Sequence, residues 1–169
     1  TRKEHPAVTW STPFEELAEG TPFSTRARTV TESDIVAFAA LTGDWHPQHA
    51  DAEWAAHSAF GQRIAHGMLV VSLAVGLVPF DPERVVALRR IRDVVFRRPV
   101  RIGDTLHVDG RIAALRPATD DAGLVTVAID VVRQDGLRAC GARIDALWRT
   151  DAAHAEPEGP FGEMVWDAA

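Results

Sequence analysis

The segment from Met68 to Val78 restricts the fold of this chain more than any other stretch, because Ser72 is its only polar residue. A helix that is apolar on every side is typically buried inside a protein. With about a dozen residues the segment is too short for a bilayer, which requires roughly 20. The sequence therefore predicts a buried helix at the centre of a soluble core.

The pattern after this helix changes to the alternation of apolar and polar residues that is typical of β-strands. The segments with this pattern are Val85–Arg92, Asp93–Arg101, Thr105–Leu115, Leu124–Gln134 and Leu137–Arg149. Asp135 and Gly136, between the last two segments, are a strong signal for a hairpin. A further strand is expected over Phe23–Val30. This order of elements predicts an α+β fold in which an antiparallel sheet wraps around the central buried helix.

A shorter helix is expected before the core helix. Thr31 can cap its first turn, and Asp34 at the third position completes a weak capping box. Gly43 suits the left-handed conformation in which many helices end. The residues after Gly43 should therefore lie on a turn.

This turn carries a carboxylate and an imidazole, Asp44 and His49. Pro47 between them pushes the preceding residue away from helical angles, so the two side chains converge only if the turn folds back. A carboxylate beside a histidine indicates proton transfer. The alternative is that Asp44 bonds its own backbone, as turn residues often do, and that His49 is an ordinary surface residue.

Gly67 stands at the start of the core helix, where the first amides have no partners within the helix. A glycine there lets a substrate carbonyl come close to the backbone, and its N–H can then stabilise an oxyanion. The alternative is that the helix entry needs a small residue for packing.

Composition limits the partners and the compartment. A net charge of −6 argues against nucleic acid as a partner. Residues 1–20 do not resemble a signal peptide, and we expect a cytoplasmic protein with no membrane contact. Cys140 is the only cysteine, which excludes an internal disulfide, and its predicted strand indicates a small core residue. We expect one domain over residues 1–149, followed by an acidic tail with several prolines and glycines over residues 150–169.

Three motifs occur in the order found in a known family: FAALTGDWHPQH (residues 38–49), RIAHGML (residues 63–69) and FRRPVRIGDTL (residues 96–106). Together they resemble the MaoC-like (R)-specific enoyl-CoA hydratases and dehydratases over about residues 25–149. The resemblance implies a single hot-dog fold, usually paired as a homodimer. It also implies a lyase that acts on acyl thioesters in fatty acid or polyketide metabolism.

By this resemblance, Asp44 and His49 would hold one water and add its two parts to a trans-2-enoyl thioester, giving the (R)-3-hydroxyacyl product, or catalyse the reverse dehydration. The amide of Gly67 would hold the thioester oxygen. The resemblance implies that the enzyme needs no cofactor. Coenzyme A or an acyl carrier protein takes part only as the portion of the substrate that carries the acyl group.

Further residues are expected to contact the substrate: Trp45, His46, His66, Met68, Ser72, Arg97 and Arg98. The chain departs from the family at two positions. His46 stands where relatives usually have asparagine, either replacing a positioning group or adding a titrating group beside Asp44. Val75 stands where some hydratases have serine, which leaves the chemistry of the substrate pocket open.

Other interpretations of these residues stay open. A metal could bind among His46, His49, His57 and His66, although Pro47 and the unmatched spacing argue against it, and we expect no metal. The fold also hosts thioesterases, and a non-catalytic acyl-binding subunit is a further alternative.

Two regions of the chain allow two interpretations each. The arginines clustered between residues 89 and 101 could meet the phosphates of coenzyme A or the acidic helix of a carrier protein, or simply pair with acids on the surface. The apolar residues near the two termini could dock on the domain or be disordered. Those residues are Val8, Trp10 and Phe14 at one end and Phe161, Met164, Val165 and Trp166 at the other.

Overall fold

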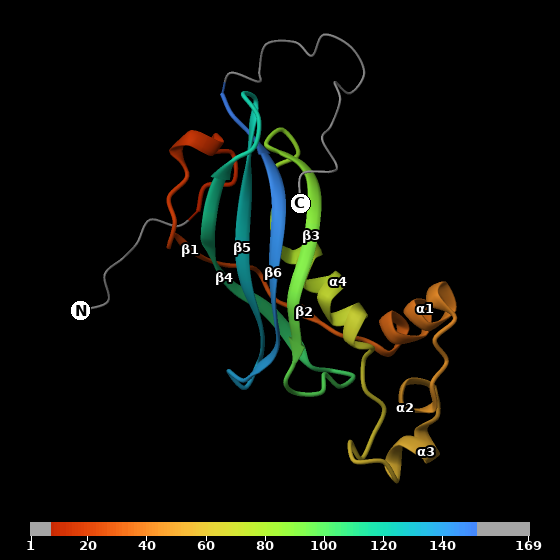
Figure 1. Cartoon of the computed structure of the whole chain (residues 1–169). Coiled ribbons are helices and arrows are strands. Elements are labelled where there is room, and N and C mark those ends of the chain that lie inside the picture. Colours follow the sequence, from red (N-terminus) through yellow and green to blue (C-terminus); the bar gives the residue numbers. More distant parts are fainter. Residues whose placement is uncertain (1–7, 152–169) are drawn as a thin grey trace, which may run out of the picture.

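A curved antiparallel sheet wraps around one helix, α4, in the computed structural model, which describes residues 8–151 (Figure 1). The elements in chain order are η1 (Phe14–Glu16), β1 (Pro22–Ser24), β2 (Arg28–Thr29), α1 (Glu32–Thr42), α2 (Pro47–Ala50), α3 (Ala52–Ala56), α4 (Gly67–Leu77), β3 (Val85–Phe96), β4 (Thr105–Pro117), β5 (Ala122–Arg133) and β6 (Arg138–Arg149). The strand order is β1-β4-β5-β6-β3, and β2 also pairs with β4. The predicted α+β class and the sheet around a helix are confirmed.

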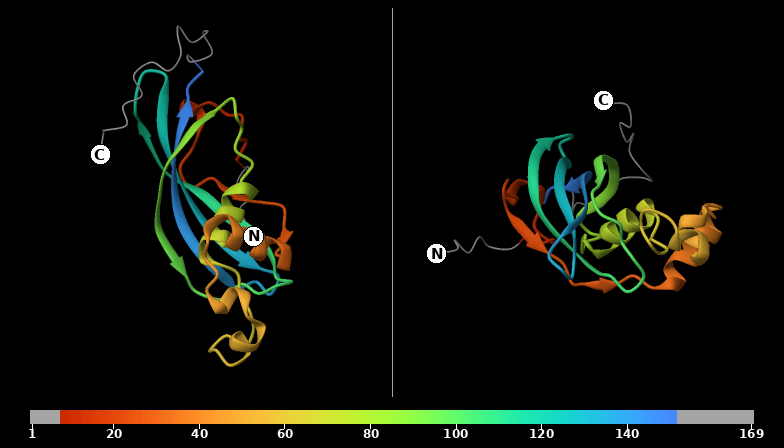
Figure 2. Two further views of the ribbon diagram at one scale, coloured as in Figure 1. Left: turned by 90° about the vertical axis from the view of Figure 1, so that its right-hand side faces the viewer. Right: turned by 90° about the horizontal axis from the view of Figure 1, so that it is seen from below.

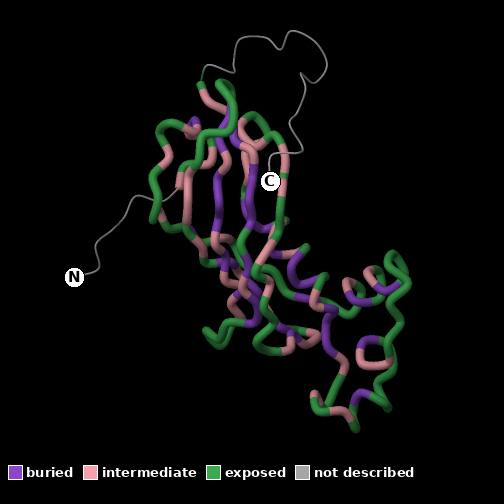
Figure 3. The backbone as a smooth tube through the Cα atoms, in the orientation of Figure 1, coloured by how far each residue is buried: buried purple, intermediate pink, exposed green. Residues whose placement is uncertain are grey.

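Helix α4 lies on the hollow side of the sheet, whereas α1, α2 and α3 project away from it (Figures 1 and 2). The residues that α4 buries in the core are Leu69, Val70, Val71, Ala74 and Leu77. Figure 3 shows buried positions on this helix and along the central strands of the sheet. The prediction of a helix buried on every side was wrong for a single copy of the chain. Met68 is 56% exposed, and Ser72 and Gly76 are exposed on the same stripe, because the sheet covers only one side of the helix.

The long strand β3 also differs from prediction, since we expected two strands over residues 85–92 and 93–101. A single strand runs through to Phe96 because Asp93 adopts a positive φ of 54° and the pairing with β6 shifts between Arg92 and Val95. Such a bulge bends a strand without ending it. The chain leaves the strand before Pro99, which has no N–H to donate to a ladder.

The strand expected over Phe23–Val30 is divided into β1 and β2. Thr25 bridges the interruption, because its backbone N–H donates to the Val108 carbonyl oxygen and its Oγ1 accepts from the Val108 N–H. Gly136 has a φ of 75° at the predicted β5–β6 hairpin, and Cys140 is buried in β6 as expected.

The residues near the N-terminus dock on the domain. Trp10 makes edge-to-face contacts with Phe23 and Phe80 and lies against Trp148. Val8 and Phe14 are partly buried against the same core. Of the two outcomes left open for this region, docking is therefore the one observed.

The predicted acidic tail falls almost entirely outside the described residues, as do its apolar residues Phe161, Met164, Val165 and Trp166. The domain boundary near residue 149 stays a prediction. Within residues 8–151, no helix has both the length and the apolar character needed to cross a membrane.

Candidate active site

Asp44 follows directly on the end of α1, and the local sequence explains why. Thr31 accepts a hydrogen bond from the Asp34 N–H, and Asp34 accepts in return from the Thr31 N–H, which confirms the predicted capping box. Gly43 ends the helix with a φ of 77°. The Asp44 carboxylate then accepts from the backbone N–H of His46 at 3.3 Å, a short local bond typical of aspartate in turns.

His49 lies on a one-turn helix and not on an irregular turn. Pro47 is the first residue of α2, and His46 is its N-cap. The expectation that Pro47 would prevent a helical presentation of His49 was therefore wrong. Proline is well suited to the first helical position, where its missing N–H is not needed and its fixed φ matches the helix.

The imidazole of His49 is buried, with 5% of the residue exposed. Its Nδ1 donates to the Ile64 carbonyl oxygen at 2.7 Å. Because a carbonyl oxygen can only accept, the proton is on Nδ1 and Nε2 has a free lone pair. The side-chain amide of Gln48 lies 3.3 Å from that Nε2 and can donate to it. His49 is thus held in the tautomer that can accept a proton at Nε2.

The surroundings keep His49 uncharged. Burial lowers the pKa of His49 below its ordinary value of 6.5. The charges of His66 and His46 lower it further, whereas the Ile64 carbonyl and the Asp44 carboxylate act in the opposite direction. The net lowering favours a neutral imidazole near pH 7.

His66 links the start of α4 to the turn that carries Asp44. Its ring is buried, with 2% of the residue exposed, and stacks on His49 with 3.8 Å between ring centroids. Its Nε2 donates to the Asp44 backbone oxygen at 3.0 Å and lies 4.0 Å from the Asp44 carboxylate. The Nδ1 of His66 has no hydrogen-bond partner within the described part of the chain.

The structure brings Asp44, His49 and His66 together, with one carboxylate oxygen and one nitrogen from each ring all within 4.8 Å of one another. Two acceptors that share one water at ordinary hydrogen-bond lengths lie roughly 4.4 Å apart. The spacing therefore suits one water between the carboxylate of Asp44 and an imidazole. The same three residues could hold a metal ion, although an ion on His66 Nε2 would break its bond to the Asp44 backbone.

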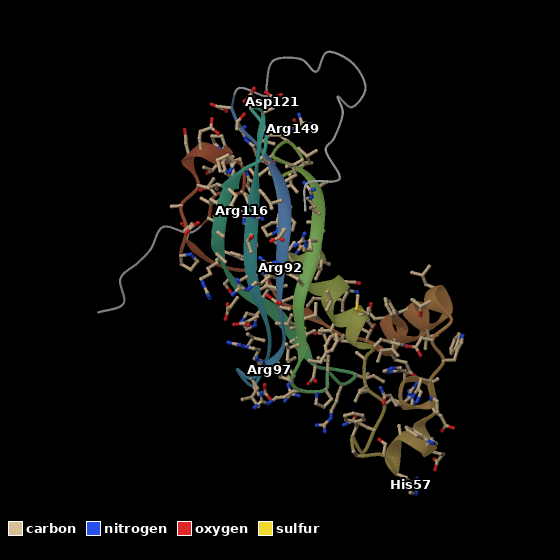
Figure 4. All side chains as sticks on the ribbon, viewed as in Figure 1. His57, Arg92, Arg97, Arg116, Asp121 and Arg149 are labelled. Carbon is tan, nitrogen blue, oxygen red and sulfur yellow. The ribbon has the colours of Figure 1, made fainter. Side chains whose placement is uncertain are left out.

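Two other histidines of the predicted metal set lie outside this group. His57 bonds the Glu53 carbonyl oxygen and lies at the far tip of the projecting helices (Figure 4). His46 accepts from the Gln48 N–H through its Nδ1 at 3.2 Å. His46 therefore caps α2, a role that sequence reasoning anticipated only as a general positioning function.

Gly67 is the first residue of α4, and among the described residues no side chain makes a capping hydrogen bond to the start of this helix, whose N-cap is His66. A Cβ at Gly67 would lie 2.7 Å from Cζ of Phe96, which is far closer than an ordinary contact. The packing reason for a glycine is therefore present. The free first-turn amides also leave the helix start open to a partial negative charge.

The remaining predicted substrate contacts are spread over the surface near α4. Trp45 is 54% exposed, and the Ser72 hydroxyl donates to the Met68 carbonyl oxygen within the helix. Ser72 and Gly76 also line a groove of about 570 Å³ between α4 and the segment that includes Arg26 and Arg28. Sequence reasoning missed this groove.

The arginine cluster is divided by the fold. Arg92 pairs with the buried Asp145 on the sheet, and Arg101 reaches the Phe60 carbonyl oxygen. Arg97 and Arg98 are exposed, and neither makes an ion pair to a described residue. Figure 4 shows Arg97 at the end of the sheet opposite Asp121 and Arg149.

The sequence of this chain is similar to those of known proteins. The sequence model described as "MaoC like domain" matches residues 14–132. Protein MaoC of Klebsiella aerogenes is 43% identical over 96 residues, which cover 56% of this chain and only 29% of that protein. The (R)-specific enoyl-CoA hydratase of Rhodospirillum rubrum is 36% identical over 107 residues, covering 62% of this chain and 72% of that enzyme.

A solved structure identifies the fold. A Mycobacterium tuberculosis protein described as having a double hot-dog fold superposes with a TM-score of 0.74 at 21% identity, over 90% of this chain and 47% of that one. The predicted hot-dog fold is confirmed.

Proposed function

Because the chain belongs to the family of MaoC-like domains, we propose that it is a hydro-lyase for acyl thioesters. It adds water across the double bond of a trans-2-enoyl thioester to give an (R)-3-hydroxyacyl thioester, or catalyses the reverse dehydration. The observation that carries this proposal is the convergence of Asp44 with the buried His49, whose Nδ1 donates to a backbone carbonyl and whose unprotonated Nε2 lies beside the Gln48 amide. A hydratase relative in Rhodospirillum rubrum supports the reaction class.

In the proposed reaction, one water donates a hydrogen bond to Asp44 and one to His49, so that its oxygen faces C3 of the substrate. His49 takes a proton from the water as the hydroxyl oxygen bonds to C3, and the π electrons move toward the thioester. The resulting enolate is protonated at C2, which returns the proton and leaves both residues as they began. The hydroxyl and the proton reach one face because a single site supplies both.

The amide of Gly67 stabilises the oxygen on which negative charge grows as the enolate forms. It is the first amide of α4, a helix with no side-chain cap, and the dipole of that helix adds partial positive charge at this end. Loss of such a donor typically costs about 10²–10³ in rate. Asp44 and His49 thus bind and activate the water, while the start of α4 stabilises the negative charge on the thioester oxygen.

The test is a panel of enoyl thioesters of increasing chain length, followed as loss of the enoyl absorbance. Asp44→Asn and His49→Gln should each lower kcat by several powers of ten, because each removes a group that binds the water. His57→Gln is the matched control, since His57 follows the end of α3 and lies away from the site (Figure 4). Unchanged turnover in both site variants would refute the assignment of these residues.

The same assay separates the alternative functions. Release of free thiol without hydration would identify a thioesterase, and binding without turnover would identify a non-catalytic subunit. Loss of activity with a chelator, followed by recovery with one divalent metal, would place an ion on Asp44, His49 and His66.

The proposed carriers of the acyl group are coenzyme A or an acyl carrier protein. Arg97 and Arg98 support this, because they follow Phe96, whose ring lies against the start of α4. Replacing both arginines with serine should raise KM and flatten its dependence on salt. Arg116→Ser is the control, because Arg116 lies on another part of the sheet (Figure 4). If the double variant and the control respond alike, the two arginines do not bind the carrier.

We also propose that the chain forms a homodimer through β3, an edge strand of the sheet. Its exposed apolar residues are Val86, Leu88, Ile91, Val95 and Phe96. A long edge strand with such residues is a liability unless another chain covers it. Sedimentation should show a dimer that Ile91→Lys weakens, and a monomeric wild-type protein would contradict the proposal.

A further inference from the structure

We propose that His46 is a positioning residue that couples Asp44 to His49 through the side-chain cap that it forms on α2. The inference rests on the proposed function, and it concerns a residue that contacts neither the water nor the substrate in that scheme. Its consequence is that full activity requires a hydrogen-bond acceptor in the side chain at position 46.

His46 makes hydrogen bonds to Asp44 and to the first turn of α2 through three sets of atoms. Its backbone N–H donates to the Asp44 carboxylate at 3.3 Å. Its carbonyl oxygen accepts from the His49 N–H at 2.9 Å and from the Ala50 N–H at 3.3 Å. Its Nδ1 accepts from the Gln48 N–H at 3.2 Å. One residue therefore fixes the acid and begins the helix that carries the base.

The cap formed by Nδ1 matters because α2 has only four residues. A helix this short has few backbone bonds to hold its shape, so the side-chain cap is a large part of what fixes its start. Since the N–H of Gln48 can only donate, Nδ1 must keep a free lone pair and the ring proton must be on Nε2.

Loss of the Nδ1 acceptor would leave the Gln48 N–H without its side-chain partner. The groups around the ring do not supply a replacement acceptor for the Gln48 N–H. They are the carboxylate of Asp44, already bonded to the His46 backbone, the ring of His49 at 6.2 Å and the indole of Trp54 on α3 at 5.6 Å. The Asp51 carboxylate is also engaged, because it accepts from the Trp54 N–H at the start of α3. Removing the acceptor should therefore loosen α2 and displace His49.

The decisive variants differ in whether the side chain at position 46 can accept a hydrogen bond. His46→Asn keeps a side-chain acceptor at an N-cap, where asparagine is among the best residues. His46→Ala has no acceptor at all. Near pH 8 we expect the asparagine variant to match the wild type and the alanine variant to lose about tenfold in kcat with a smaller change in KM.

Rescue by asparagine and the split between kcat and KM separate positioning from a merely structural role. A variant that is only less stable keeps a normal kcat per folded molecule, whereas a displaced His49 lowers kcat in fully folded protein. Urea denaturation should therefore accompany the kinetics for all three proteins. Full activity of His46→Ala, or a His46→Asn variant as slow as His46→Ala, would overturn the proposal.

An NMR measurement of amide hydrogen exchange tests the same cap without reference to catalysis. The Gln48 amide should exchange more slowly in the wild type and His46→Asn than in His46→Ala. If the chain proves to have no hydratase activity but the Gln48 amide behaves in this way, the proposed function fails while the cap stands. Equal exchange of the Gln48 amide in all three proteins would refute the cap itself.

Discussion

Replacing Gly67 with alanine should impair catalysis much more than folding. The substitution keeps the backbone N–H that is proposed to hold the thioester oxygen, and it adds only a methyl group. That methyl would lie 2.7 Å from Cζ, 2.9 Å from Cε1 and 3.0 Å from Cε2 of Phe96. Because ordinary contacts begin near 3.4 Å, either the ring or the helix start must move by about 0.7 Å.

The structure allows the effects on stability and activity to be estimated separately. Phe96 is 53% exposed, so its ring can turn aside at limited cost, and alanine gains up to about 1 kcal/mol over glycine in a helix. The free energy of unfolding should therefore change by less than about 1 kcal/mol. If the helix start yields part of the 0.7 Å, kcat should fall by about 10- to 100-fold, since a displacement near 1 Å can cost 10²-fold.

A double-mutant cycle with Phe96→Ala identifies the cause of that loss. The assay measures kcat and KM for an enoyl thioester, together with urea denaturation, for the wild type, both single variants and the double variant. If the Phe96 ring is responsible, Gly67→Ala with Phe96→Ala should be no slower than Phe96→Ala alone. If instead the double variant has the same low kcat as Gly67→Ala while Phe96→Ala has a normal kcat, the methyl group obstructs the substrate itself. Full activity of Gly67→Ala would refute the claim that the helix start must be placed accurately.

Three further predictions concern buried polar groups. Because the pKa of His49 is lowered from 6.5, the acid limb of kcat/KM should lie below pH 6.5; a limb above that value would contradict a neutral, buried His49. The lowered pKa also makes the contribution of His49 to folding stability greatest above pH 6.5. This contribution is lost progressively as the pH falls, because acid protonates His49 in the unfolded chain first. Urea denaturation at pH 7.5 and 5.5 measures the loss after the values for His49→Gln are subtracted. Asp104→Ala should cost about 1–3 kcal/mol of unfolding free energy with little change in kcat, since Asp104 accepts from the Arg101 N–H and the Gln134 side chain in a turn outside the site.

The elements that could be predicted from sequence are those fixed by local chemistry. Thr31, Asp34 and Gly43 define α1 at both ends, and the structure confirms all three roles. The β3 strand could not be predicted correctly, because its continuity depends on a positive φ at Asp93 and on pairing with β6 about fifty residues away. Alternation alone contains no information about a bulge, and a non-glycine residue at positive φ is uncommon.

The candidate site shows the same division between local and distant causes. The sequence placed Asp44 and His49 close together along the chain, but spacing could not show that they converge. Convergence depends on the segment before α4, whose Ile64 carbonyl oxygen fixes the tautomer of His49 and whose His66 ring bonds the backbone of Asp44. A backbone carbonyl is the same in every residue, so no sequence pattern could have revealed that contact.

This dependence has a consequence for how the site responds to change. The segment that orients both proposed catalytic residues continues directly into Gly67, the proposed oxyanion donor. A displacement of this segment would therefore alter the acid, the base and the donor together instead of one at a time. Variants at Ile64 or His66 should consequently show non-additive losses with Asp44 and His49, whereas variants of His46, which acts only through α2 and the turn, should leave the placement of Gly67 unchanged.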